Sequence, residues 1–283
     1  MMIERAFVTL AEGQVHLRRS RPEAPSGEAM LLFHASPASS WSLQGLMEAL
    51  ARGAPGLTLI APDTLGNGDS PPPTPEAPEI GYFADSMLRL ADSLGLERVH
   101  VYGSHTGARI ACEFAAAYPD RVGRVVLDGI TEYEDDLRND ILANYAPVVT
   151  PDDHGGQYAW AYNFVRDQAL YFPYFRRDAA HRLAGAMPPA AVIHRVVLDV
   201  LKTLGTYSKP YLAAFRYRAY ERMDVIAAPV LLLKPDTELP ILNAAVARAA
   251  EHLRDGHVAT IAGGDHNKAQ AMLAFLQQGA GTP

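Results

Sequence analysis

The sequence has a single cysteine and no excess of basic residues. Because Cys112 has no partner within the 283 residues, no intramolecular disulfide can form, and a cytoplasmic location is favoured. Lys and Arg number 25 against 32 Asp and Glu, and the resulting net charge of −7 predicts no basic surface for nucleic acid or an anionic membrane. We therefore expect a small-molecule substrate as the partner. The oligomeric state stays open.

Long apolar segments are missing as well. No apolar run approaches the roughly 20 residues of a membrane-spanning helix. The opening residues, Met-Met-Ile-Glu-Arg-Ala-Phe, carry charges where a signal peptide needs its apolar segment. We expect a soluble, intracellular protein that does not bind membranes, and its 48% of hydrophobic residues can bury a large core.

Strand-like and helix-like stretches alternate through most of the chain. Residues 4–20 alternate as two strands joined at Glu12-Gly13, with His16 expected to face outward. Further strands are predicted at 29–35, 57–63, 99–102, 122–128, 229–234 and 257–261. Helices are predicted at 41–50, 82–94, 108–118, 239–253 and 268–276. This order predicts an α/β fold with a mostly parallel sheet.

The alternation stops between residues 131 and 224, where the sequence is helical and rich in aromatic residues. We interpret residues 131–224 as an inserted helical cap and residues 1–130 and 225–283 as the core. The expected boundaries rest on this change of pattern alone.

One cap segment combines aromatic rings with a cation. Tyr158, Tyr162 and Arg166 are spaced four apart and therefore share one helix face, with Trp160 close by. These residues could bind substrate, because an arginine can clamp a carboxylate or stack on an aromatic ring. Equally, the rings could pack the cap on the core while Arg166 pairs with a local acid. Asp167 points to another face and is not the expected partner.

The stretch Gly103-Ser-His-Thr-Gly107 joins a predicted strand to a predicted helix. In the G-x-S-x-G pattern the central residue lies on a strained turn that exposes its side chain above the sheet. Here the central residue is His105. Shifting the frame to make Ser104 the nucleophile would break both flanking glycines and the strand register, so a triad on Ser104 is the less favoured alternative.

Four segments together resemble the α/β-hydrolase fold, and the resemblance covers essentially the whole chain, with the cap the least similar part. The segments are 31–37 (Leu-Leu-Phe-His-Ala-Ser-Pro), 63–70 (Asp-Thr-Leu-Gly-Asn-Gly-Asp-Ser), the turn at 103–107 with its ungapped continuation through 114–122, and 261–266 (Ile-Ala-Gly-Gly-Asp-His). The resemblance implies a mostly parallel sheet flanked by helices, an inserted cap and an enzyme, a hydrolase that needs no organic cofactor.

The resemblance also implies a base and an acid. His266 matches the general base on the loop after the last strand, and a histidine pKa near 6.5 suits proton transfer. The acid that orients it is Asp236, with Glu238 beside it, or else Asp128 after the strand at 122–128. Asp128 could instead cap backbone amides at its strand end.

The turn at 31–37 supplies the remaining implied roles. The backbone amides of Ser36 and Thr106 match the oxyanion hole of the family, and the Ser36 hydroxyl is expected to face the pocket. His34 could contact substrate, although bracing of its loop is the favoured interpretation.

His105 has three possible functions: a nucleophile or base acting with His266, a metal ligand with His266 and an acid, or a relic in a protein without catalysis. Triad geometry would place the two rings about 3 Å apart, and neighbouring imidazoles resist double protonation, so one stays basic. The spacing of a zinc motif on one helix is absent, so metal ranks lower and no metal is predicted.

We hypothesise an α/β-hydrolase-fold enzyme that hydrolyses an ester or carbon–carbon bond of a small, aromatic or acidic carbonyl compound. In this hypothesis His105 and His266 replace the serine triad. The alternatives are a cofactor-free lyase, decarboxylase or oxygenase on the same scaffold, and a non-catalytic ligand-binding protein.

Overall fold

An amino-terminal hairpin forms one edge of the sheet. β1 (Ile3–Leu10) pairs antiparallel with β2 (Gly13–Ser20), from Ile3 opposite Ser20 to Leu10 opposite Gly13. The computed structural model, which describes residues 2–278, therefore confirms the predicted hairpin.

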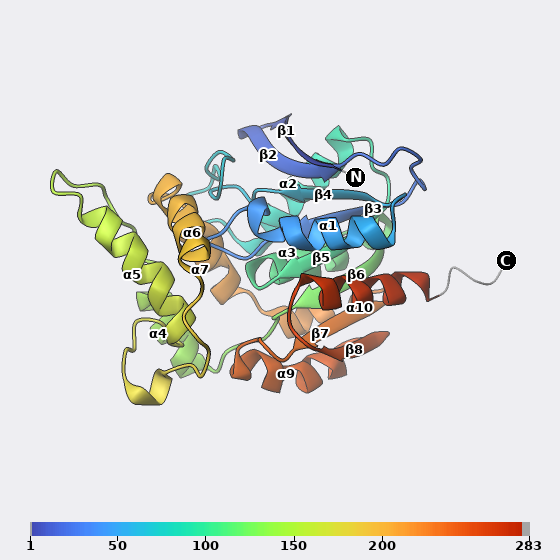
Figure 1. Cartoon of the computed structure of the whole chain (residues 1–283). Helices are drawn as coiled ribbons and strands as arrows, with labels where there is room; N and C mark the ends of the chain where they lie inside the picture. Colours follow the sequence, from blue (N-terminus) through green and yellow to red (C-terminus); the bar gives the residue numbers. More distant parts are fainter. Residues whose placement is uncertain (1, 279–283) are drawn as a thin grey trace.

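The sheet has eight strands in the order β1-β2-β4-β3-β5-β6-β7-β8 (Figure 1). β2 pairs antiparallel with β4, and every pair from β4 across to β8 is parallel, which confirms the mostly parallel sheet. The parallel strands are β3 (Ala29–Phe33), β4 (Thr58–Pro62), β5 (Val99–Ser104), β6 (Val122–Asp128), β7 (Val230–Pro235) and β8 (Gly256–Ile261).

Helices cover both faces of the sheet. α1 (Gln44–Gly53) and α10 (Asp265–Gln277) lie on one face, with α2 (Ile80–Ser93) and α3 (Thr106–Ala117) on the other (Figure 1). β3 divides its side chains between them: Leu31 and Phe33 belong to one apolar cluster, Met30 and Leu32 to the other, and all four are fully buried. Such burial on alternate sides explains the continuous apolar run of this strand.

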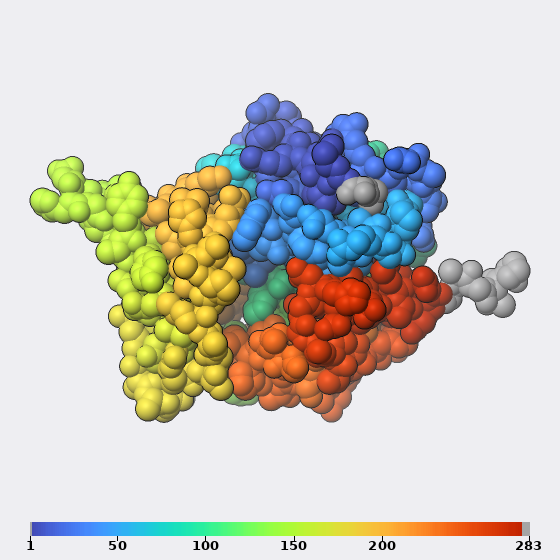
Figure 2. All heavy atoms as spheres, in the orientation of Figure 1, coloured from blue at the N-terminus to red at the C-terminus, as the bar shows by residue number. Residues whose placement is uncertain are grey.

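Five helices lie between β6 and β7. They are α4 (Asp135–Asn144), α5 (Gly156–Leu170), α6 (Ala190–Lys202), α7 (Ser208–Arg216) and α8 (Ala219–Met223). α4 to α7 form a mass at one end of the molecule, and Figure 2 shows a hollow between this mass and the carboxy-terminal helices. A third apolar cluster, rich in aromatic side chains, fills the interior of this mass, whereas α8 packs in the core cluster beside α3.

Two predicted helices differ most from expectation, with α-helical starts three residues away from the predicted ones. The helix predicted at 41–50 is a 3-10 turn, Ser40–Leu43, followed by α1, and the last helix begins at Asp265, where the sequence predicted 268. The earlier start follows Gly264, whose carbonyl accepts from the Lys268 amide at 3.1 Å. His266 therefore lies on the first turn of a helix and not on a loop. No helix within residues 2–278 combines the length and apolar character needed to span a membrane.

Candidate active site

The turn between β5 and α3 carries His105 in a strained conformation. Its φ of +50° and ψ of −104° fall outside the common regions, at a cost of about 1–3 kcal/mol. The two flanking glycines permit the turn: a Cβ on Gly103 would lie 2.0 Å from the Gly107 carbonyl oxygen, and one on Gly107 would lie 2.1 Å from the Phe33 carbonyl oxygen. Ser104 ends β5, so the tip of the turn is His105.

Glu238 is the acid that contacts His105. His105 Nε2 lies 3.1 Å from Glu238 Oε2, and the Glu238 side chain is only 9% exposed. Burial opposes ionisation, but the hydrogen bond and charge of His105, the Leu239 amide and the charge of Lys268 together lower the pKa of Glu238 to about 2. An ionised Glu238 has no proton to donate, so its charge favours a proton on the neighbouring Nε2, and Nδ1 is then the basic nitrogen.

The two other acids predicted for this role have different partners. Asp236 is exposed, and its Oδ1 accepts from the Gly263 amide at 2.7 Å. Asp128 is fully buried and accepts at Oδ2 from the Tyr102 hydroxyl at 2.8 Å and from Lys268 Nζ at 2.6 Å. Neither carboxylate contacts a histidine ring in the described part of the chain, although the Asp128 backbone carbonyl accepts from the His105 amide at 2.8 Å.

His266 is exposed on the first turn of α10. Within residues 2–278 no hydrogen bond or ion pair joins it to His105, because the His105 ring points toward Glu238 and Gly129. The side chain that reaches a buried acid from this segment is Lys268, two positions further on. The structure thus forms His105–Glu238 and Lys268–Asp128 pairs where a His105–His266 pair was expected.

A cavity of about 250 Å³ lies beside His105, between the core and the cap. Ser36, His105, Thr106 and Arg109 line it from the core side. The cap contributes the aromatic rings Tyr133, Tyr145, Phe172, Tyr211 and Phe215. A small planar molecule would therefore contact rings on one side and the turn at His105 on the other.

The backbone amides predicted for an oxyanion hole both border this cavity. Ser36 and Thr106 are 7% and 3% exposed. Within residues 2–278 neither amide N–H has a protein acceptor, so both remain available to a ligand oxygen. The Ser36 hydroxyl itself donates to Asn67 Oδ1 at 3.2 Å.

His34 holds two loops together. Its Nδ1 donates to the Ala35 carbonyl at 2.9 Å, and its Nε2 accepts from the Thr64 amide at 3.0 Å. Complete burial lowers the pKa of His34, which keeps the ring neutral as this arrangement requires. The contacts match the bracing interpretation.

The four cap residues predicted to bind substrate do not line the cavity. Tyr158 and Tyr162 are 61% and 46% exposed, and Trp160 stacks on Phe164 with ring centroids 4.7 Å apart. Arg166 pairs with Asp167, Nε to Oδ1 at 2.8 Å, so the expectation that Asp167 is not its partner was wrong. Consecutive residues on a helix point in different directions, but the long Arg166 side chain can fold back to reach Asp167.

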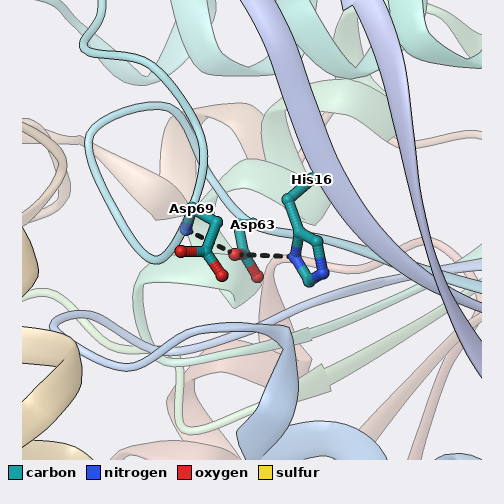
Figure 3. A group of neighbouring side chains, drawn as sticks. All are labelled: His16, Asp63 and Asp69. Carbon is teal, nitrogen blue, oxygen red and sulfur yellow. Dashed lines mark hydrogen bonds and ion pairs between the residues drawn. The ribbon is translucent and has the colours of Figure 1, made fainter.

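A second cluster contains groups that could ligate a metal, and Figure 3 shows it. His16 is only 2% exposed, which corrects the expectation that it faces outward, and its Nδ1 lies 2.9 Å from Asp63 Oδ2 (Figure 3). Asp69 completes the group. Arg5 donates to both His16 Nε2 and Asp69, and Lys202 Nζ lies 2.7 Å from Asp69 Oδ1. Arg5 and Lys202 thus contact the second ring nitrogen of His16 and both oxygens of Asp69. The contacts join the hairpin, the loop after β4 and the cap.

Sequence reasoning named Glu238 only beside Asp236, and it missed Lys268 and Arg109. A signal for Arg109 was present, since it is a cation within the alanine-rich stretch that follows the turn at His105. The pairing of Lys268 left no trace in the sequence.

Comparison with known proteins agrees with the fold. A family model described as alpha/beta hydrolase fold matches residues 28–266. An uncharacterised protein of Mycobacterium tuberculosis (strain ATCC 25618 / H37Rv) is 36% identical over 120 residues, 42% of this chain and 34% of the relative. A 2-hydroxy-6-oxononadienedioate/2-hydroxy-6-oxononatrienedioate hydrolase of Paraburkholderia xenovorans (strain LB400) is 35% identical over 127 residues, 44% of this chain and 43% of the relative. The chain thus matches less than half the length of these curated relatives.

Solved structures resemble the chain over nearly its whole length. An E-2-(acetamidomethylene)succinate hydrolase superposes with a TM-score of 0.69 at 22% identity, covering 98% of this chain and 100% of the other. A bromoperoxidase from Bacillus anthracis gives a TM-score of 0.70 at 18% identity, covering 97% and 100%. Identities this low indicate a shared fold and no more. Because the family model spans most of the sequence, the chain belongs to the alpha/beta hydrolase fold family.

Proposed function

We propose that this protein hydrolyses an ester or carbon–carbon bond of a small carbonyl compound, with His105 as the base and Glu238 as the acid that orients it. The observation that carries the proposal is the 3.1 Å contact between His105 Nε2 and Glu238 Oε2 beside a cavity with two available amides. A base held by a buried carboxylate next to oxyanion donors is the arrangement that acyl transfer requires.

The first step is attack by water. His105 Nδ1 removes a proton from a water molecule as its oxygen bonds to the substrate carbonyl carbon, and the carbonyl π electrons move to oxygen. The imidazolium that forms is stabilised by ionised Glu238, whose low pKa keeps it charged at neutral pH. The oxyanion accepts hydrogen bonds from the amides of Ser36 and Thr106.

The second step is collapse of this intermediate. The carbon–oxygen π bond re-forms, and the bond to the alkoxide or carbanion leaving group breaks. The proton held by His105 passes to the leaving group, so His105 returns to its neutral form and water has been added across the cleaved bond. In the alternative step, His105 itself attacks the carbonyl carbon to give an acyl-imidazole, and the same two amides would stabilise the oxyanion.

The role given to Glu238 replaces the His105–His266 pair that we hypothesised from the sequence. The contact with Glu238, and the exposed position of His266 on α10, support this change. Two similar proteins are named as hydrolases of dicarboxylates, a nonadienedioate or nonatrienedioate and a succinate, which supports a hydrolase of small carboxylate-bearing compounds. The proposed steps use only His105, Glu238, the two backbone amides and water, and they involve no metal or organic cofactor.

The test is turnover of a panel of small aryl esters and vinylogous diketones in water enriched in ¹⁸O. We expect one ¹⁸O in the acid product and a fall in kcat/KM of about 10²–10⁴-fold in His105→Ala. Product analysis without water incorporation would favour a lyase, decarboxylase or oxygenase. Ligand binding without any turnover would favour a binding protein.

Mass spectrometry separates the two roles of His105. Rapid quenching during turnover should show no acylated His105 if His105 acts as a base. An acyl adduct on His105 that accumulates and then decays would establish the nucleophile and contradict the water-attack step.

A further inference from the structure

Arg109 is the one lysine or arginine with a buried side chain within residues 2–278, at 4% exposure. It lies on α3 one helical turn after His105. Its Nη1 donates to the His105 carbonyl at 3.1 Å and its Nη2 to the Thr131 carbonyl at 2.9 Å, while Nε is buried without an acceptor. A guanidinium has five N–H donors, so these contacts leave it incompletely satisfied.

No carboxylate neutralises Arg109. Within residues 2–278 no acid comes within 4.0 Å of its guanidinium, although the other buried charges have partners. Asp128 contacts Lys268, and Asp167 contacts Arg166 and Arg177. Because an unpaired buried charge is strongly unfavourable, a cation without a counter-charge is unusual inside a protein.

The surroundings of Arg109 favour an anion. Arg109 lines the cavity, and no acidic side chain is among the residues that line it. Burial raises the pKa values of Tyr133 and Tyr145, so these hydroxyls remain protonated donors. Gln168 accepts from the Tyr211 hydroxyl at 2.9 Å through Oε1, which leaves its amide hydrogens as further donors.

We propose that Arg109 binds the carboxylate of a small planar acid, whose body lies between the aromatic rings of the cap and the turn at His105. The cavity, of about 250 Å³, suits an aromatic or unsaturated acid with the carboxylate one helical turn from the reacting carbonyl. That the acid is the substrate rests on the proposed function, whereas its binding to Arg109 does not. We therefore assign the carboxylate-binding role to Arg109 and not to Arg166, which pairs with Asp167 and does not line the cavity.

The test is calorimetric titration with two acids and their neutral amides, benzoate against benzamide and cinnamate against cinnamamide. A charge-assisted contact predicts that the wild-type protein binds at least one acid about tenfold to a hundredfold more tightly than its amide. Arg109→Gln should remove this preference, and Arg109→Lys should keep part of it. The matched control, Arg166→Gln, should retain the full preference because Arg166 does not line the cavity.

Two results would overturn the proposal. One is equal affinity of the wild-type protein for both acids and their amides, a comparison that needs no variant and holds even if Arg109→Gln fails to fold. The other is an unchanged preference in folded Arg109→Gln. If the acids bind through Arg109 and no panel compound is hydrolysed, the proposed function fails and the anion site stands.

Discussion

His105 Nε2 contacts Glu238 Oε2 at 3.1 Å, so the tip of the turn after β5 is tied to the segment that follows β7. The carboxylate fixes which ring nitrogen carries the proton and leaves Nδ1 as the basic nitrogen. The pair also couples the function of the site to the stability of the loop after β7.

Replacing Glu238→Gln should lower kcat by about 10²–10⁴-fold with a much smaller change in KM. The amide is neutral and can present an N–H to Nε2, so it neither stabilises the imidazolium nor selects the right tautomer. Steady-state kinetics on an ester that the wild-type protein hydrolyses measure kcat and KM for both proteins. Asp236→Asn is the control, and a loss confined to that variant would make Asp236 the acid.

The two histidines should behave differently. His105→Ala should lose most turnover, whereas His266→Ala should stay within about threefold of the wild-type protein because surface substitutions have small effects. Both variants can be compared in one assay. If turnover survives in His105→Ala and is lost in His266→Ala, the base is His266 and our assignment is wrong.

Stability should fall in acid because of Glu238. Its pKa in the folded protein, about 2, lies below the ordinary glutamate value of 4.5, so it contributes stability above pH 4.5 that is lost as the pH falls toward 2. The contribution is at most about 3 kcal/mol. In urea unfolding at pH 6, 4 and 3, the free energy of unfolding should fall less with decreasing pH in Glu238→Gln than in the wild-type protein. An identical pH dependence in both proteins would contradict the shift.

Asp167→Asn should destabilise the cap. Asp167 is 1% exposed; its Oδ1 accepts from Arg166 Nε at 2.8 Å and its Oδ2 forms an ion pair with Arg177 Nε at 2.7 Å, so the change removes two ionic contacts. We expect a loss of about 2 kcal/mol in the free energy of unfolding. Arg177→Gln is the control and should lose less, because its side chain is 55% exposed. Equal stability of Asp167→Asn and the wild-type protein would show that the contacts contribute nothing net.

Gly107→Ala should disrupt the turn at His105. A Cβ there would lie 2.1 Å from the Phe33 carbonyl oxygen, which forces the turn away from β3 at a cost of about 1–3 kcal/mol. Gly81→Ala on α2 is the matched control, since no atom lies within 4 Å of the added Cβ, and it should be neutral or stabilising by up to about 1 kcal/mol. Thermal unfolding compares the two. A Gly107→Ala protein as stable as the control would disprove the close approach.

The elements of the fold were predictable because they depend on local patterns. The hairpin, the buried strands and the turn at Gly103-Ser-His-Thr-Gly107 follow from side-chain periodicity and from glycine placement, which act over a few residues. The start of α10 at Asp265 was not predicted, and that shift placed His266 on a helix. The boundaries of the cap remain a prediction.

Sequence alone determined that His105 lies at the tip of the turn, because two glycines and a strand register fix that frame. Only the tertiary structure decided that Glu238 contacts it, that Arg166 folds back on Asp167 and that His16 is buried against Asp63. Among the residues that the structure describes, it also leaves Arg109 without a counter-charge. The reason is physical: ion pairs need atoms within about 4 Å. Such distances between segments far apart in the chain are set by packing of the whole molecule and by the reach of each side chain, neither of which a local pattern encodes.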